Sequence, residues 1–160
     1  LSALSLLAKE VHALHLPDMA VVAPDAGGVK RARNLAYILD VPMVVMEKKR
    51  FLDRHDESEA FQIIGDVRGK SVVIVDDVIS SGGTIINGAV SLIKVGAKSV
   101  TVLVTHAVCA GNAFERLAKA PIDHMIMTDT INWSGKIMPS FVKVVSVASE
   151  IAGAISTIIG

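Results

Sequence analysis

The chain has 160 residues, the size of one domain, and its 16 basic and 16 acidic side chains leave no formal net charge. Without a positive overall field, and with 4% aromatic residues, the composition argues against a nucleic-acid-binding protein. A lone cysteine, Cys109, excludes an intrachain disulfide and favours a reducing, cytoplasmic setting.

Strand and helix patterns alternate along the whole chain, so we expect a single domain over residues 1–160. Strands are predicted at 19–23, 41–46, 61–64, 72–75, 100–105, 124–127 and 142–145, and helices at 3–15, 29–39, 84–95, 111–118 and 148–159. The apolar content of 51% is what a parallel sheet covered on both faces requires. This order predicts a three-layer α/β fold with a mainly parallel sheet and helices on both faces.

Both ends of the chain carry weaker signals. The apolar stretch that begins at Val142 is interrupted by Lys143 and Glu150, so it predicts part of the core and not a membrane span. We expect no membrane association. The first residue is Leu1 and not Met, which indicates a fragment or a processed product.

The most informative segment runs from Val72 to Thr84. Its four apolar residues predict a buried strand, and two acids, Asp76 and Asp77, follow at the carboxyl end, where α/β sheets bind ligands. The small residues of the next turn precede a helix and can offer N–H groups and hydroxyls to a phosphate; they are Ser80, Ser81, Gly82, Gly83 and Thr84. Carboxylates repel a phosphate and suit either sugar hydroxyls or a divalent metal. The segment therefore predicts a site for a sugar phosphate.

A second loop, Asp25-Ala26-Gly27-Gly28, also follows a strand and opens a helix. Its N–H groups could bind another anion, and Lys30, Arg31 and Arg33 in the helix would add positive charge. Alternatively, the two glycines make a tight turn beside a solvated basic face. Asp25 is the candidate ligand for magnesium.

Two stretches resemble known phosphate-binding motifs. Residues 72–84 resemble the phosphoribosyl pyrophosphate (PRPP) binding motif of the type I phosphoribosyltransferase fold. Residues 22–33 are similar to the pyrophosphate loop of the ribose-phosphate pyrophosphokinase family, and the weaker matches at 105–116 and 128–131 fit the same family. The similarity covers nearly the whole chain but only the C-terminal half of a family member.

The resemblance implies a magnesium-dependent transferase that moves the diphosphoryl group of ATP to the 1-hydroxyl of ribose 5-phosphate, giving PRPP and AMP. Asp76 and Asp77 would face the ribose hydroxyls and associated magnesium, and the 80–84 turn would hold the 5-phosphate. Asp25 would hold magnesium, and Ala26, Gly27 and Gly28 would frame the pyrophosphate. Ser80-Ser81 stands where many members carry Asp-Thr, so the details of substrate contact differ. The resemblance also implies a homo-oligomer.

Lys48 and Arg50 match the family's catalytic lysine and arginine. Within the charged, irregular stretch 47–59, residues 47–50 are predicted to lie just past the end of a strand, where positive charge can stabilise a transferring phosphoryl group. The non-periodic residues 51–59 are predicted to be a mobile lid. Alternatively, Lys48 and Arg50 lie in a solvated basic turn. His106, at another strand end, is predicted either to touch the substrate or to pack.

Two other functions remain open at this level. A phosphoribosyltransferase would consume PRPP and transfer its ribose to a base, although no segment is left over for the substrate-binding hood of that class. A non-catalytic regulatory subunit would be expected to lose the acid pair or the charged loop, and this sequence keeps both.

Overall fold

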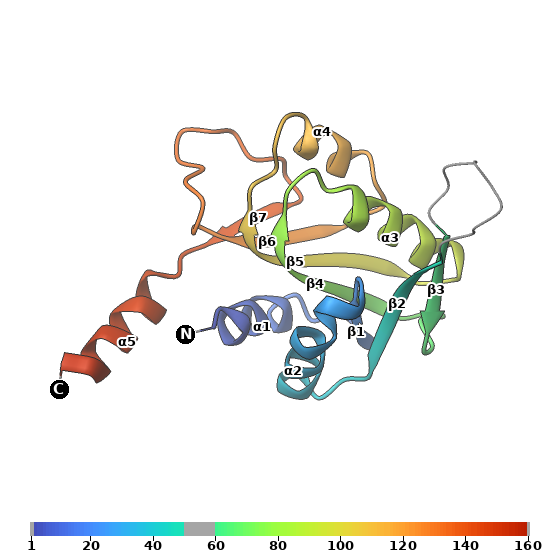
Figure 1. Cartoon of the computed structure of the whole chain (residues 1–160), viewed down its shortest axis with the longest axis horizontal. Helices are drawn as coiled ribbons and strands as arrows, with labels where there is room; N and C mark the ends of the chain where they lie inside the picture. The colour runs from blue at the N-terminus through green and yellow to red at the C-terminus, as the bar shows by residue number, and fades with distance from the viewer. Residues whose placement is uncertain (1, 50–59, 160) are drawn as a thin grey trace.

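The computed structural model describes residues 2–49 and 60–159, which form a seven-stranded sheet with helices on its two faces (Figure 1). The strands are β1 (Met19–Ala23), β2 (Met43–Lys49), β3 (Ala60–Ile64), β4 (Ser71–Ile79), β5 (Ser99–Ala107), β6 (His124–Thr128) and β7 (Val142–Val145). Their order is β3-β2-β1-β4-β5-β6-β7, and only β2 and β3 pair antiparallel within this sheet. The predicted fold class is confirmed.

Helices cover both faces of the sheet. The helical segments are α1 (Leu4–His12), η1 (Ala26–Gly28, a 3₁₀ turn), α2 (Val29–Leu39), α3 (Gly83–Lys94), α4 (Ala113–Ala118) and α5 (Ala148–Ile159). The apolar sides of α1 and α2 pack on one face, and those of α3 and α4 pack on the other.

The central strand β4 shows why its sequence lacks polar alternation. Val72 and Ile74 belong to the core beneath α3 and α4, whereas Val73 and Val75 belong to the core beneath α1 and α2. All four side chains are fully buried. A strand covered on both faces needs apolar residues at every position.

The strand order reverses between β1 and β4, which are parallel neighbours with Val22 opposite Ile74. In an open α/β sheet such a reversal opens a crevice at the carboxyl ends of the two strands. The Asp25–Gly28 loop follows β1, and the acid pair lies near the end of β4. The topology therefore brings the two predicted phosphate-binding segments together.

The strands β4 and β2 continue three or more residues beyond their predicted ends because a neighbouring strand continues beside each of them. β4 extends to Ile79, since β5 pairs with it as far as Ala107. β2 extends to Lys49, since the antiparallel β3 pairs along its second half. The predicted irregular stretch 47–59 is therefore strand at its beginning, and residues 50–59 lie outside the described part.

The prediction that the apolar stretch from Val142 belongs to the core is confirmed for β7, whose Val145 is buried, and is wrong for the C-terminal helix. No residue of α5 is buried, and the helix extends away from the sheet in Figure 1. Ile155 and Ile158 are 49% and 84% exposed. Apolar periodicity correctly predicted a helix here, but periodicity does not specify the surface against which a helix packs. Among the described residues, no helix has both the length and the apolar character needed to cross a membrane.

Candidate functional site

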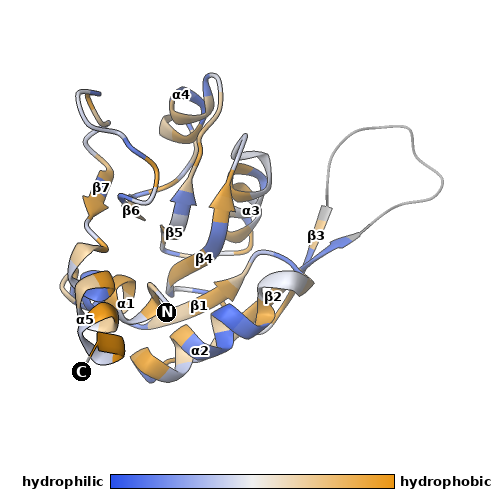
Figure 2. Cartoon of the chain, turned by 60° about the vertical axis from the view of Figure 1, so that its left-hand side comes forward, coloured by the Kyte–Doolittle hydropathy of each residue, from blue (hydrophilic) through white to orange (hydrophobic). Residues whose placement is uncertain are grey.

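The acid pair lies in the last part of β4 and is tied to helix α2 by one arginine. Arg31 Nη1 lies 3.1 Å from Asp76 Oδ1, and Arg31 Nη2 lies 2.6 Å from Asp77 Oδ2. The Asp76 side chain is 19% exposed and that of Asp77 is 60% exposed. In Figure 2 the pair is visible as a hydrophilic band that interrupts apolar β4 just before its carboxyl end. Arg31 was predicted to add positive charge to the anion loop, and it instead faces the acids.

Backbone groups orient both carboxylates as well. Asp76 Oδ1 accepts a hydrogen bond from the N–H of Asp77 at 2.8 Å, and Asp77 Oδ1 accepts one from the N–H of Val78 at 2.9 Å. Each acid therefore has one oxygen engaged by the backbone, and the orientation of the pair is set before any ligand binds.

The two acids titrate differently. Burial raises the pKa of Asp76 to about 6, against the lowering effects of the Asp77 N–H and the Arg31 charge. Burial also raises the pKa of Asp77, but the effect is smaller because this side chain is more exposed. The hydrogen bond with Asp76 and the charge of Arg31 together lower the pKa by more than burial raises it, so the pKa of Asp77 lies below its usual value. Asp77 is thus the more firmly ionised acceptor of the two.

The Ser80–Gly83 turn is held from behind by the segment that follows β5. The N–H of Ala110 donates to the carbonyl of Ser80 at 2.9 Å, and Arg116 Nη1 donates to the carbonyl of Ser81 at 3.4 Å. Gly82 has a φ of +78°, and a Cβ there would lie 3.3 Å from Leu117 Cγ, so the turn requires glycine at this position. The supporting roles of Ala110, Arg116 and Leu117 were not predicted.

Helix α3 begins directly from this turn. The N–H of Ile86 donates to the carbonyl of Gly82 at 2.9 Å, so the N–H groups of Gly83, Thr84 and Ile85 precede that first intrahelical bond. The side chains of Ser80 and Ser81 are exposed beside them. Amide donors at a helix start, with hydroxyls nearby, make a site for a phosphate.

The second loop differs in one respect from its prediction. Asp25 Oδ1 accepts the N–H of Gly28 at 2.9 Å, so this amide already has a partner before any pyrophosphate arrives. Gly28 is buried, and a Cβ there would lie 3.1 Å from Pro24 Cδ. Ala26 and Gly27 are exposed and remain the candidates for contact with a ligand.

Magnesium fits this donor set through Asp25. The described residues contain no group of three or more His, Cys, Asp or Glu side chains placed to hold a metal ion. Magnesium does not need one, because it is commonly bound by one or two carboxylates together with substrate phosphates and water. Asp25 is exposed and keeps its second oxygen, Oδ2, for this purpose.

Lys48 is exposed, but the prediction that it follows the end of a strand is wrong. It lies within β2, in register with Phe61 of β3. Arg50 lies outside the described residues.

His106 occupies the carboxyl end of β5, in register with Val78. Its Nδ1 is 2.9 Å from Thr130 Oγ1, which donates to the carbonyl of Thr105 at 2.8 Å. His106 is exposed, which rules out the packing alternative. Thr130 was not predicted as its partner, because 24 residues separate them.

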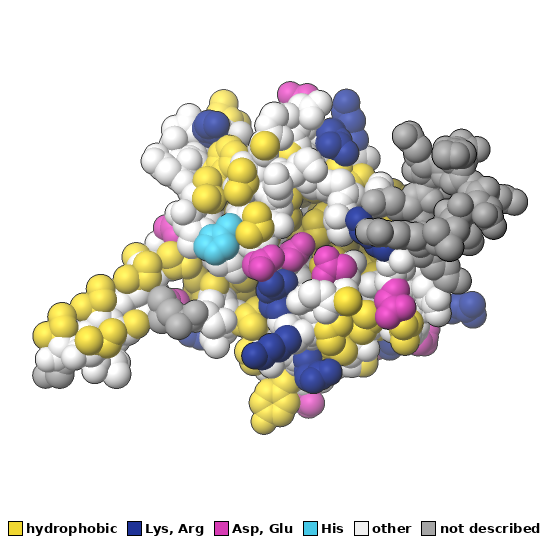
Figure 3. All heavy atoms as spheres, in the orientation of Figure 1, with side chains coloured by type: hydrophobic (Ala, Val, Ile, Leu, Met, Phe, Trp, Pro, Cys, Tyr) yellow, Lys and Arg dark blue, Asp and Glu magenta, His cyan; other side chains and the backbone are white. Residues whose placement is uncertain are grey.

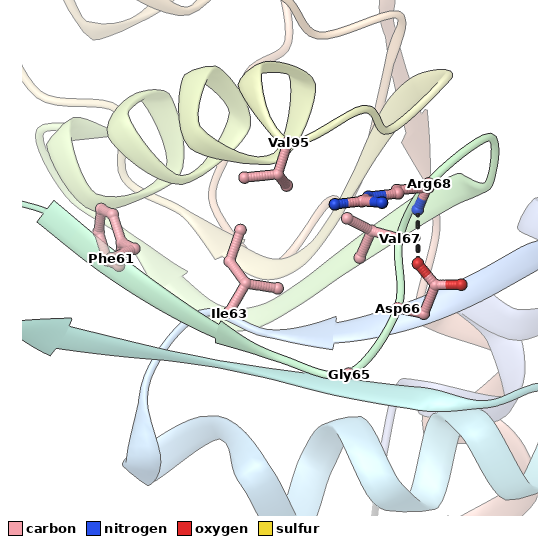
Figure 4. Close-up of a pocket in the computed structure, with 7 residues that line it drawn as sticks. All are labelled: Phe61, Ile63, Gly65, Asp66, Val67, Arg68 and Val95. Atoms are coloured by element: carbon pink, nitrogen blue, oxygen red, sulfur yellow. Dashed lines mark hydrogen bonds between the residues drawn. The ribbon is translucent and has the colours of Figure 1, made fainter.

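Two hollows lie outside the acid pair and the phosphate turn. One, of about 220 Å³, lies between β3 and α3 toward the amino end of β4; there the N–H of Arg68 donates to Asp66 Oδ1 (Figure 4). The other, of about 200 Å³, lies between His106, the start of α1 and the start of α5. Charged side chains of both signs instead gather near the middle of the face seen in Figure 3.

Comparison with known proteins shows the family to which the chain belongs. A ribose-phosphate pyrophosphokinase of Clostridium acetobutylicum is 43% identical over 88% of this chain and 44% of its own length, and one of Rhizobium meliloti is 39% identical over 98% and 50%. The crystal structure of phosphoribosylpyrophosphate synthetase from Mycobacterium smegmatis superposes with a TM-score of 0.86 at 31% identity, over 98% of this chain and 50% of that one.

The chain thus spans about half the length of the curated relatives that it matches. The resemblance to ribose-phosphate pyrophosphokinases is confirmed. The profile of the phosphoribosyl transferase domain matches residues 4–150, which is most of the chain. The chain therefore belongs to the phosphoribosyl transferase domain family.

Proposed function

We propose that this chain is the ribose 5-phosphate-binding half of a ribose-phosphate diphosphokinase, which transfers the diphosphoryl group of ATP to ribose 5-phosphate and gives PRPP and AMP. The observation that carries the proposal is the juxtaposition, at the carboxyl side of the adjacent strands β1 and β4, of the acid pair, the start of helix α3 and a second loop with its own carboxylate. The similarity to pyrophosphokinases over most of the chain supports it.

Ribose 5-phosphate would bind with its two ends on different parts of the β4–α3 connection. The 5-phosphate would accept hydrogen bonds from the amides of the 80–84 turn, aided by the hydroxyls of Ser80, Ser81 and Thr84. The ring hydroxyls would donate to Asp76 and Asp77, because ionised carboxylates are acceptors only. These two sets of contacts would fix the direction in which the 1-hydroxyl points.

In the reaction, the 1-hydroxyl oxygen forms a bond to the β-phosphorus of ATP, and the bond from that phosphorus to the oxygen bridging it to the α-phosphorus breaks. AMP leaves with the electron pair, and the hydroxyl proton passes to solvent. Magnesium, when bound, would supply charge neutralisation for the phosphates. Asp25 would hold it, and Ala26, Gly27 and Gly28 would border the diphosphate.

Lys48 would stabilise the negative charge that builds on the phosphoryl oxygens, as would Arg50. Removing one such donor lowers the rate by about 10²–10³ in comparable sites. Otherwise the protein acts mainly by positioning the two substrates.

The test is the release of AMP when ATP, magnesium and ribose 5-phosphate are supplied together. AMP that depends on ribose 5-phosphate supports the proposal. Transfer of the ribose moiety from supplied PRPP to a base would instead favour the phosphoribosyltransferase alternative. Binding of ribose 5-phosphate without turnover, in a preparation that also contains the other half of a pyrophosphokinase, would favour the regulatory subunit. Light scattering after size exclusion tests the proposed homo-oligomer.

A matched pair of variants assigns the sugar contact. Asp77→Asn removes one ionised acceptor while keeping the shape of the side chain, and we expect it to lower ribose 5-phosphate affinity about 10- to 100-fold, the range for a hydrogen bond to a charged group. Asp66→Asn, at the opposite end of the sheet, is the control and should bind like the wild type. Unchanged affinity in Asp77→Asn, measured by calorimetry, would contradict the role given to Asp77.

A further inference from the structure

The inference concerns Arg31, and it rests on the proposed function of the acid pair. The sequence offers several basic residues at the start of α2, but this one is directed toward β4, where its two terminal nitrogens each contact a different carboxylate. The contact joins residues 45 positions apart in the sequence.

The position of Arg31 on α2 is fixed by packing. The residue that follows it, Ala32, is fully buried, as is Leu35 one turn further on, and both belong to the core against β1 and β4. The Arg31 side chain itself is 22% exposed. Its guanidinium is planar and presents its donors in a fixed fork, so it can hold two acceptors in a defined relation, which a lysine ammonium cannot do.

The contact also divides the carboxylate oxygens between different partners. Arg31 donates to Oδ1 of Asp76, and the same oxygen accepts the N–H of Asp77. Arg31 also pairs with Oδ2 of Asp77, and Oδ1 of Asp77 accepts the N–H of Val78. Asp76 Oδ2 is thus engaged neither by Arg31 nor by these backbone N–H groups, and the Asp77 side chain is 60% exposed.

A second consequence follows from where α2 begins. The helix starts directly after the Asp25–Gly28 loop, and η1 in that loop contacts β4. Arg31 therefore links the loop proposed to border the diphosphate with the acids proposed to hold the sugar. A small displacement of either segment relative to the other would misalign the two substrates.

We propose that Arg31 is a positioning residue for ribose 5-phosphate: it holds Asp76 and Asp77 in the arrangement that accepts the sugar hydroxyls, and it keeps them in register with the Asp25–Gly28 loop. Arg31 acts through the acids and does not itself touch the sugar. The alternative for the same contact is competition, in which Arg31 occupies the acids and must be displaced by the ligand.

The test uses the full 160-residue chain with two probes, ribose 5-phosphate and inorganic phosphate, both in the presence of magnesium. In Arg31→Met we expect ribose 5-phosphate to bind about 10- to 100-fold more weakly, the range for lost hydrogen bonds to charged groups. Inorganic phosphate, which needs only the 80–84 turn, should bind with unchanged affinity by phosphorus NMR titration. Arg31→Lys keeps the charge but not the fork and should recover only part of the loss.

Arg68→Met is the matched control, because Arg68 is an exposed arginine at the opposite end of the sheet. It should bind both probes like the wild type, and circular dichroism should show the same fold in all three variants. A loss of affinity for both probes in Arg31→Met would mean a general structural effect and would overturn the inference.

The outcomes separate the inference from the function on which it rests. Equal or tighter binding of ribose 5-phosphate by Arg31→Met, with normal binding by the wild type, overturns the positioning role alone and supports competition. If the wild-type chain binds inorganic phosphate but shows no preference for ribose 5-phosphate, the proposed function fails and the inference fails with it.

Discussion

The partly buried acid Asp76 should make the stability of the fold depend on pH, and Asp76→Asn should remove its contribution to that dependence. Asparagine has nearly the same shape and keeps an oxygen for the Asp77 N–H and for Arg31. In the wild type, burial raises the pKa of Asp76 from 3.8 to about 6. The folded protein therefore holds this proton more tightly than the unfolded chain does.

The sign and size follow from that difference. As the pH rises from about 4, the unfolded carboxyl ionises first, and the free energy of unfolding falls until the folded carboxyl ionises near 6. Two pKa units at about 1.4 kcal/mol each set an upper bound of about 3 kcal/mol. Because the Asp76 carboxylate is partly solvated and asparagine loses the charge attraction to Arg31, we expect Asp76→Asn to be about 1–2 kcal/mol more stable than the wild type at pH 8.

Urea unfolding at pH 4, 5, 6 and 8, without magnesium or nucleotides, measures this difference directly. The difference in the free energy of unfolding between Asp76→Asn and the wild type should grow between pH 4 and 6 and stay constant above pH 6. The free energy of unfolding of Asp66→Asn should follow that of the wild type throughout. A difference that is the same at every pH, or a variant less stable than the wild type at pH 8, would refute the reasoning. The activity of Asp76→Asn should fall, because the variant lacks an ionised acceptor for the sugar hydroxyls.

Burial raises the pKa of Cys109 to about 11, so its thiol should stay neutral at pH 8. Iodoacetamide should therefore modify Cys109 at least about tenfold more slowly in the folded chain than in the urea-unfolded chain, as measured by mass spectrometry. Equal rates would contradict the burial of this thiol. Leu117→Ala should lower the free energy of unfolding by about 2–5 kcal/mol, because Leu117 is fully buried behind Gly82, whereas Ile155→Ala on exposed α5 should change it by less than about 0.5 kcal/mol. Comparable losses in the two variants, measured by urea unfolding, would mean that α5 is packed in solution.

Much of the fold could be predicted from the sequence because the decisive signals are local. The apolar run of β4 reports burial on both faces, and the small residues after it report a turn that opens a helix. The ends of strands were harder to predict. Beyond Val75 the residue pattern turns polar, yet β4 continues to Ile79 because β5 pairs beside it. Strand length there depends on a partner 28 residues away in the sequence, as the register of Val78 with His106 shows.

The errors at the site also concern contacts between distant residues. An arginine near a helix start can reach either an anion in the preceding loop or an acid on the neighbouring strand, and the sequence does not say which. The structure directs Arg31 to the acids because β1 and β4 are adjacent. The exposure of α5 was missed for the same kind of reason: an apolar helix pattern requires a partner surface but does not identify it.

The strand order therefore brings the two motifs together into one candidate site. The Asp25–Gly28 loop and the acid pair are separated along the chain by all of α2, β2 and β3. Their strands are direct neighbours, about 4.8 Å apart across the sheet, and the register of Val22 with Ile74 places the end of β1, Ala23, beside the start of the acid pair. If β4 lay beside β2 instead, another strand spacing would separate the loops, and Arg31 would not bridge from α2 to both acids. The contact of Arg31 with Asp76 and Asp77 thus depends on this topology as well as on the two local motifs.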